Sequence, residues 1–194
     1  TPESLDKISD IIPIDYFQFR PKHECLSERL KFVEKYFYDI SKICKSKNIN
    51  LIINNDFEIA KKFSFDGIHL GQRDKKCSDA KKNFGNKFIV GVSCSDSVEL
   101  YYEAEKQRAD YVAFGPVFES ITKKKKTINI EKTLTSINNL RLPFTLIGGI
   151  NHSNFMQLYD FRPRNIAIIS CFWNYKKGPY QSALLFKKIL DKKK

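Results

Sequence analysis

Long apolar runs are missing from this sequence. Its 194 residues contain no stretch near the ~20 consecutive apolar residues that a membrane-spanning helix needs, and its start lacks the pattern of a signal peptide. We therefore expect no membrane contact and a cytoplasmic location. A chain of this length with 42% hydrophobic residues can bury one sizeable core, so we expect a single domain over residues 1–194.

Paired cysteines are also missing. The five cysteines are widely spaced and form no Cys-x-x-Cys pair: Cys25, Cys44, Cys77, Cys94 and Cys171. An odd number at such spacing argues against a disulfide framework and against a zinc site. We expect reduced thiols that serve mainly as packing residues.

Acidic residues are few relative to basic ones. Asp and Glu number 22 against 34 Lys and Arg, which gives a formal net charge of +12. Such an excess suits a nucleic-acid partner, an anionic small substrate or a generally basic surface. The lysines are spread over the whole chain, so no dedicated nucleic-acid face is evident and this partner is the least favoured.

The stretch 110–126 combines a strand with a basic loop. Residues 111–114 form a short apolar run typical of a buried strand, and Ser120, Thr122 and four lysines at 123–126 follow it. Hydroxyl and ammonium groups just past the carboxyl end of a buried strand suit a phosphate. A solvated basic loop is the plainer alternative.

Strand-like and helix-like segments alternate along the chain, which predicts an α/β fold with parallel strands joined by helices. We expect seven strands, near residues 15–20, 51–53, 67–71, 88–93, 110–115, 144–150 and 166–170. We expect eight helices, near residues 1–12, 26–47, 59–63, 80–84, 97–107, 130–140, 154–159 and 182–190. A TIM (β/α)8 barrel has eight of each. The prediction is therefore this barrel with its first strand missing from the supplied sequence, and a seven-stranded open barrel is the alternative.

Loops after the strands of such a barrel share one mouth. The residues expected there are Gln18, Arg20, Lys22, Asn54, Asn55, Asp56, Gln72, Asp74, Ser93, Ser120, Thr122, Lys123, Gly148, Gly149 and Ser170. This set is polar and rich in cations, and its glycine pair lets backbone N–H groups approach a phosphate. It predicts a diphosphate or doubly phosphorylated ligand, with Mg²⁺ held by one or two oxygens.

The same segments resemble the thiamine-phosphate synthase/TenI superfamily. Residues 18–22 (QFRPK) are similar to the family's Q-x-R-x-K, and residues 66–74 closely match its D-G-x-H-L-G-Q-x-D. The strand-end Asn54 and Asn55 occupy the place of its N-D pair. Further segments follow in the family order at 91–93, 109–118, 122–123, 147–150 and 168–170. Together they cover nearly the whole chain.

The resemblance implies a transferase of thiamine biosynthesis. Such an enzyme joins hydroxymethylpyrimidine diphosphate to thiazole phosphate and releases pyrophosphate, by a dissociative path that asks the protein to stabilise departing negative charge. It also implies a Mg²⁺ cofactor and phosphorylated small-molecule partners, with a monomer, a dimer or a larger homo-oligomer all compatible.

The resemblance assigns roles to individual residues. Arg20, Ser93 and Lys123 would be the catalytic groups. The implied substrate-binding residues are Gln18, Arg20, Lys22, Asn54, Ser93, Ser120, Thr122, Lys123, Gly149 and Ser170. Four of them would hold the thiazole phosphate: Ser120, Thr122, Gly149 and Ser170. The implied metal ligands are Asp74 and Asn55.

Two positions depart from the family's pattern. Asn55 stands where the family has a second metal-binding Asp, and Pro21 stands where it usually has Glu. A neutral amide ligand predicts weaker Mg²⁺ binding. Two alternatives stay open. One is a TenI-like thiazole tautomerase, whose catalytic His position is here Pro116. The other is a degenerate barrel that only binds a phosphorylated ligand.

The three histidines and the lone tryptophan add little. His69 lies inside a strand and is expected to be a satisfied barrel residue rather than an acid or base. His23 and His152 are expected on surface loops. Trp173 is expected to pack in the core, with a cover over the mouth as the alternative.

Overall fold

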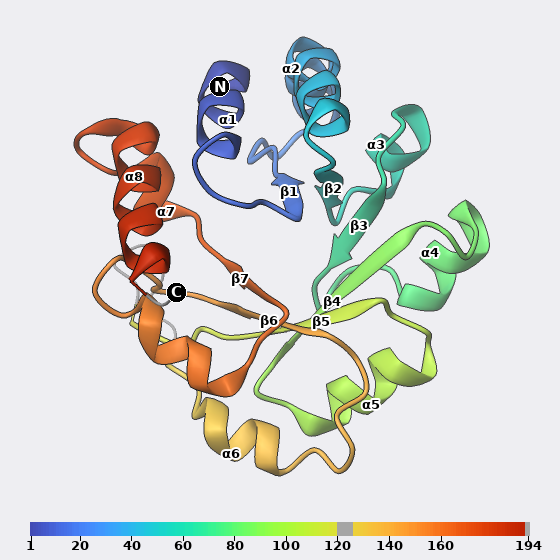
Figure 1. The fold of residues 1–194 in the computed structure, drawn as a ribbon. Coiled ribbons are helices and arrows are strands. Elements are labelled where there is room, and N and C mark those ends of the chain that lie inside the picture. The colour runs from blue at the N-terminus through green and yellow to red at the C-terminus, as the bar shows by residue number, and fades with distance from the viewer. Residues whose placement is uncertain (120–125, 193–194) are drawn as a thin grey trace.

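Seven parallel strands form one curved sheet in the computed structural model, which describes residues 1–119 and 126–192 (Figure 1). The strands pair in chain order, and every neighbouring pair is parallel. Their bounds are β1 Tyr16–Phe19, β2 Asn50–Asn54, β3 Gly67–Leu70, β4 Ile89–Ser95, β5 Tyr111–Phe114, β6 Phe144–Ile147 and β7 Asn165–Ala167. The expected TIM-type fold is confirmed, as a half-barrel with β1 and β7 at the two edges of its described sheet.

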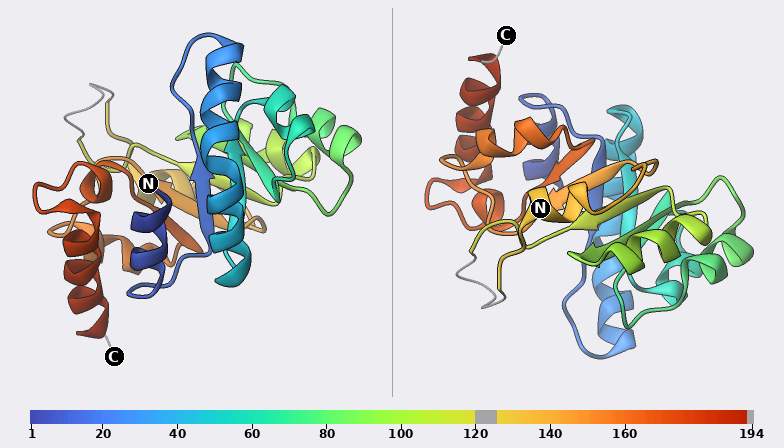
Figure 2. Two further views of the ribbon diagram at one scale, coloured as in Figure 1. Left: turned by 90° about the horizontal axis from the view of Figure 1, so that it is seen from above. Right: turned by 90° about the horizontal axis from the view of Figure 1, so that it is seen from below.

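Helices cover the outer face of the sheet (Figures 1 and 2). They are α1 Pro2–Ser9, α2 Leu26–Ser46, α3 Phe57–Lys62, α4 Cys77–Phe84, α5 Val98–Lys106, α6 Ile130–Thr135, the 3₁₀ helix η1 Phe155–Phe161, α7 Ser170–Trp173 and α8 Gly178–Asp191. Helix α1 packs against both α2 and α8, so the first and last helices of the described chain lie side by side. No helix in the described ranges is long and apolar enough to cross a bilayer.

The core lies between the sheet and the helices. Successive strand residues point to opposite faces, and the outward set is fully buried, as Ile53, Ile68 and Phe114 illustrate. Inward residues such as His69 and Tyr111 are mostly rather than completely buried, and they are more polar. The interior of the half-barrel therefore presents hydrogen-bonding groups, whereas its outside presents the apolar face on which the helices pack.

Several helix ends follow from local chemistry. Thr1, Asp56 and Ser97 accept hydrogen bonds from backbone N–H groups in the first turns of α1, α3 and α5, as N-cap side chains do. Asp96 and Ser97 are both suitable caps for α5 by residue type, and the structure selects Ser97.

In the C-terminal third, several element bounds predicted from the sequence differ from those of the structure. Helix α6 ends at Thr135 instead of near residue 140, because hydroxyl side chains bond back to helix carbonyls there and the next residues are poor helix formers. Strand β7 stops at Ala167, and Ser170 begins α7, a helix the sequence did not predict. Helix α8 begins at Gly178, because a proline is tolerated in a first turn. The expected helix near 154–159 is the 3₁₀ helix η1.

Trp173 is neither a core residue nor fully exposed. It ends α7 with 39% of its surface accessible. Its ring meets Phe17 of β1 edge-on, with 6.4 Å between the ring centroids. The expectation that it packs in the core is therefore wrong, because it lies on a short surface helix beside the edge strand.

Candidate active site

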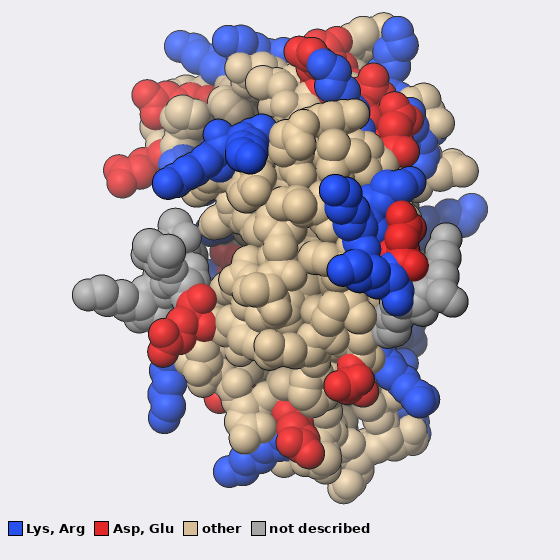
Figure 3. Space-filling model, turned by 60° about the vertical axis from the view of Figure 1, so that its left-hand side comes forward, with Lys and Arg blue, Asp and Glu red and all other residues tan. Residues whose placement is uncertain are grey.

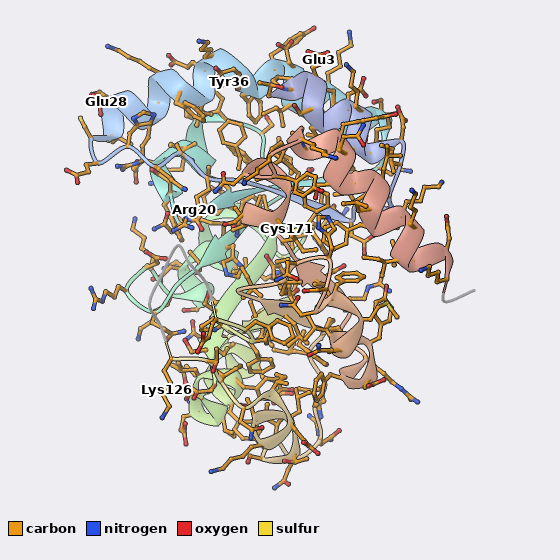
Figure 4. All side chains as sticks on the ribbon, turned by 90° about the vertical axis from the view of Figure 1, so that its left-hand side faces the viewer. Glu3, Arg20, Glu28, Tyr36, Lys126 and Cys171 are labelled. Atoms are coloured by element: carbon orange, nitrogen blue, oxygen red, sulfur yellow. The ribbon has the colours of Figure 1, made fainter. Side chains whose placement is uncertain are left out.

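A cationic pocket of about 510 Å³ lies where β1 and β2 end. Arg20 and Lys22 follow β1, Asn54 and Asn55 end β2, and Lys75 follows β3. The lining residues are Arg20, Pro21, Lys22, His23, Arg29, Asn54, Asn55, Asp56, Phe57, Glu58 and Lys75. Lys and Arg outnumber Asp and Glu in this lining, as an anionic ligand requires. Figure 4 places Arg20 on the same side of the molecule as Glu28 and Lys126.

Asn55 and Asp74 join the ends of β2 and β3. Asn55 has the left-handed φ of 50°, which Asn tolerates well, and its backbone N–H donates to the carbonyl oxygen of His69 at 2.8 Å. Its Nδ2 donates to Oδ1 of Asp74 at 3.2 Å, and Oδ2 of Asp74 accepts from the N–H of Gly71 at 2.6 Å. The two residues expected to bind a metal are therefore in direct contact.

Asp56 is turned away from that pair. Its Oδ1 accepts from the N–H of Ile59 at the start of α3, and its Oδ2 accepts from Nε of Arg29 at 2.7 Å. Nη1 of Arg29 also donates to the carbonyl oxygens of His23 and Glu24. Arg29 thus ties the loop that carries Lys22 to the start of α3.

Arg29 is a pocket residue that the sequence did not single out. It stands in the first turns of the 21-residue helix α2, among many charged side chains. One charged residue on a long solvated helix gives no periodic signal, so only the packing of α2 beside α3 reveals it.

His69 links two strands inside the half-barrel. Its Nδ1 lies 3.0 Å from the hydroxyl of Tyr111, and its Nε2 lies 2.9 Å from Oγ of Ser93. Burial, with a smaller contribution from Arg20, lowers the pKa of the imidazole to about 4, against a smaller opposing effect of Asp74. The ring is therefore neutral at pH 7 and both nitrogens are engaged, as the sequence predicts for a satisfied barrel residue.

Gln18 and Ser93 lie on this inner face rather than in the pocket lining. Gln18 of β1 is partly buried, in register with Ile52 of β2. The side chain of Gln72 donates from Nε2 to the carbonyl oxygen of Ser93, which fixes the end of β4. The residues expected to bind the diphosphate thus fall into two sets: Arg20, Lys22 and Asn54 line the pocket, whereas Gln18 and Ser93 lie on the inner face of the sheet.

The strand ends of β6 and β7 carry the residues expected to bind a second phosphate. Gly149 has a φ of 68°, and a Cβ there would stand 2.4 Å from the carbonyl oxygens of Phe118 and Glu119, so only glycine fits. Ser170 follows β7, the neighbour of β6. Ser120 and Thr122, expected at the same phosphate, and Lys123, expected at the leaving diphosphate, lie outside the described residues.

His152 lies in a loop, as expected, but it is only partly exposed and packs against α7 and α8. Its Nε2 lies 3.0 Å from Oγ of Ser182 on α8, and its ring packs against Phe186 with 4.4 Å between centroids. Cys171 Sγ lies 3.4 Å from its Nδ1. The histidine joins α7 to α8, helices whose packing the sequence did not predict. His23 is exposed in a loop, as expected.

Positive charge is not gathered into one basic surface on the face seen in Figure 3. Lys and Arg stand with Asp and Glu around the rim of that face, and its middle is largely uncharged. This distribution agrees with lysines spread along the chain.

Comparison with known proteins gives consistent matches. The sequence profile that describes the thiamine monophosphate synthase family matches residues 3–172. The chain is 37% identical over 168 residues to a thiamine-phosphate synthase of Pelagibacter ubique (strain HTCC1062), covering 84% of this chain and 77% of that protein. It is 30% identical over 171 residues to a thiamine-phosphate synthase of Dictyoglomus thermophilum, covering 86% of this chain and 74% of that protein.

Solved structures share the fold. A thiamine phosphate pyrophosphorylase from Pyrococcus furiosus superposes with a TM-score of 0.81 at 24% identity, covering 98% of this chain and 89% of that one. A 3-hexulose-6-phosphate synthase superposes with a TM-score of 0.65 at 13% identity, covering 96% and 91%.

Proposed function

The chain belongs to the thiamine monophosphate synthase family, and we propose that it joins hydroxymethylpyrimidine diphosphate to thiazole phosphate. The C–O bond to the diphosphate breaks, a C–N bond to the thiazole nitrogen forms, and pyrophosphate leaves. The observation that carries this proposal is the convergence of Arg20, Lys22, Asn54 and Asn55 on one pocket at neighbouring strand ends, with Asp74 in contact with Asn55.

The pocket suits the work that a departing diphosphate demands. In a dissociative path the protein mainly stabilises the negative charge of the leaving group and holds both rings. Arg20 offers a planar set of donors for phosphate oxygens, and Lys22 adds a point charge. Gln18 and Ser93, on the inner face beside the pocket, would contact the pyrimidine side and the leaving group.

The thiazole phosphate would bind at the ends of β6 and β7. Gly149 lets the backbone approach closely, and Ser170 supplies a group at the next strand end. Ser120 and Thr122 complete this part of the proposal, whereas Lys123 would bind the leaving diphosphate together with Ser93. All three lie between Glu119 and Lys126, outside the described residues.

Asp74 and Asn55 fit a Mg²⁺ site in which phosphate oxygens of the substrate complete the coordination of the ion. Mg²⁺ prefers oxygen ligands and often takes only one or two carboxylates from the protein, keeping waters and phosphate oxygens for the rest. The carboxylate of Asp74 is held at the rim, and the amide of Asn55 can present its oxygen once it turns over. The bound ion would supply positive charge to the diphosphate.

The tautomerase alternative finds less support. Pro116 has no titratable group at the position that carries the catalytic histidine in that branch. His69 cannot take its place, because both of its ring nitrogens are engaged and burial keeps its pKa near 4. A cytoplasmic location also belongs to our proposal, since all five cysteines are free, as a reducing compartment favours.

A product assay tests the proposed function. Purified protein is incubated with hydroxymethylpyrimidine diphosphate, thiazole phosphate and Mg²⁺, and thiamine phosphate and pyrophosphate are measured separately. We expect the two products in equal amounts. Pyrophosphate without thiamine phosphate would point to simple hydrolysis. No product, together with a melting temperature raised by the substrates, would replace the synthase with a binding protein.

A further inference from the structure

Tyr111, His69 and Ser93 form a chain of hydrogen bonds across three strands. The Tyr111 hydroxyl lies 3.0 Å from Nδ1 of His69, and Nε2 of the same ring lies 2.9 Å from Oγ of Ser93. A neutral imidazole carries one ring proton, so one nitrogen donates and the other accepts. The direction of the whole chain therefore depends on a single tautomer.

The surroundings favour the tautomer with its proton on Nε2. A phenol hydroxyl is a good donor and a poor acceptor, because its lone pair is delocalised into the ring. The described residues offer the Tyr111 proton no hydrogen-bond acceptor except Nδ1 of His69. If Nδ1 carried the proton, the phenolic proton would be left unsatisfied in a buried place, which is costly. With the proton on Nε2, Tyr111 donates to His69 and His69 donates to Ser93.

This arrangement frees the hydroxyl proton of Ser93. Oγ of Ser93 then accepts from His69, so its own proton must point to another acceptor. Ser93 stands where the register between β4 and β5 shifts, an irregularity that re-aims a side chain. We propose that Tyr111 and His69 are positioning residues that turn the Ser93 hydroxyl proton toward the mouth, where it donates to an oxygen of the diphosphate. This inference rests on the proposed function.

The strands are shaped to seat this chain. A Cβ at Gly91 would stand only 2.0 Å from the ring of Tyr111, so glycine at this position of β4 makes room for the tyrosine. The ring of Tyr16 also packs against Tyr111, with 5.6 Å between the two ring centroids. Tyr111 is thereby held with its hydroxyl at His69, and its burial raises the pKa of the phenol, which keeps the proton in place.

The tautomer of His69 can be observed directly. Long-range ¹H–¹⁵N spectra of the full chain contain ring signals from only three histidines, and His23→Gln and His152→Gln identify those of His69 by elimination. We expect wild-type His69 with a protonated Nε2 and an acceptor Nδ1. In Tyr111→Phe we expect a larger share of the tautomer with its proton on Nδ1 than in the wild type. The matched control Tyr16→Phe should leave the spectrum unchanged. A purely structural tyrosine would not move these signals.

Pyrophosphate binding tests the consequence for Ser93. We expect Tyr111→Phe and Ser93→Ala each to weaken pyrophosphate binding about tenfold, the loss of one hydrogen bond to a charged group. The double variant should bind no more weakly than Ser93→Ala alone, because both changes remove the same bond. A wild-type ring protonated on Nδ1, an unchanged tautomer in Tyr111→Phe, or additive losses would each overturn the inference. If wild-type protein bound no pyrophosphate, the proposed function would fail. The tautomer spectra alone would then decide whether Tyr111 sets the direction of the hydrogen bonds through His69 to Ser93.

Discussion

The side-chain amide of Asn55 donates a hydrogen bond to Oδ1 of Asp74 at 3.2 Å, which joins the ends of β2 and β3 at the rim of the half-barrel. Two groups that are 19 residues apart in the chain are thereby placed where one ion or one phosphate can meet both. The pair contains one negative charge where two carboxylates would contain two. We therefore expect the Asn55–Asp74 pair to bind Mg²⁺ more weakly than two carboxylates would.

Replacing Asn55 by Asp should strengthen Mg²⁺ binding. Aspartate tolerates the left-handed φ of 50° at this position, so the backbone need not move. We expect the Mg²⁺ concentration needed for half-maximal product formation to fall about tenfold. Asp56→Asn is the matched control, because Asp56 is engaged by Arg29 and α3 and should not change the Mg²⁺ requirement. A rise in the Mg²⁺ requirement of Asp56→Asn as large as the fall in Asn55→Asp would show that the effect is one of general charge, because the two changes alter the local charge in opposite directions.

Replacing Arg29 by Met should loosen the loop that carries Lys22. The change removes its bonds to Asp56, His23 and Glu24 and leaves the Asp56 carboxylate, which is 9% exposed, without its partner. We expect a loss of about 1–3 kcal/mol in the free energy of unfolding, measured with urea. The control is Lys62→Met, which breaks an ion pair with Glu34 that is about half exposed on both sides. That change should cost less than ~1 kcal/mol. Equal losses would mean that the Arg29 cluster is an ordinary surface pair.

Gly149→Ala separates backbone strain from steric conflict. Gly85 has φ 87° and ψ 168°, a conformation almost confined to glycine, and nothing lies within 4 Å of the place where a methyl group would stand, so its replacement by alanine should cost only the ~1–3 kcal/mol of backbone strain. Gly149 has the same kind of φ but faces two carbonyl oxygens at 2.4 Å, so its loss should be larger. We also expect Gly149→Ala to raise the KM for thiazole phosphate, while Gly85→Ala leaves it unchanged. A KM that is equal in the two variants would remove Gly149 from the proposed phosphate site.

Thiol reactivity should single out Cys25. Hydrogen bonds from Ser27 and its neighbours lower the pKa of this exposed thiol, so it holds more thiolate at a given pH than an ordinary cysteine. Burial raises the pKa of Cys44 and Cys94 to about 12, so both should stay protonated and protected at pH 8. A limited dose of iodoacetamide followed by peptide mass spectrometry should find the label on Cys25. Label on Cys44 or Cys94 before Cys25 would show that the core opens.

The strand order was predictable because each strand is a short apolar run between polar residues. Strands such as β2 and β5 are buried on the helix side, so their outward residues must be apolar. This requirement is visible in the sequence as a short apolar run for each strand. The residues at the mouth follow from the same reading, since parallel strands end at one edge. Asn54, Asn55 and Asp74 were found in this way.

Other features depend on packing between distant segments. The bonds from Arg29 to Asp56 and from His152 to Ser182 join residues 27 and 30 positions apart, and neither pair has a local pattern. Helix α7 has only four residues, too few for a helical period to appear. Such contacts become visible only when the helices have been placed around the sheet.

Calorimetric titration of the full chain with pyrophosphate asks whether the cationic pocket binds a diphosphate, on which the proposed reaction depends. We expect binding that strengthens with Mg²⁺ and weakens at least tenfold in Arg20→Gln, since a charge-assisted bond is lost. The matched variant Arg73→Gln, at a residue outside the pocket lining, should bind as the wild type does. No binding by the wild type, or equal binding by Arg20→Gln, would contradict the proposed diphosphate site.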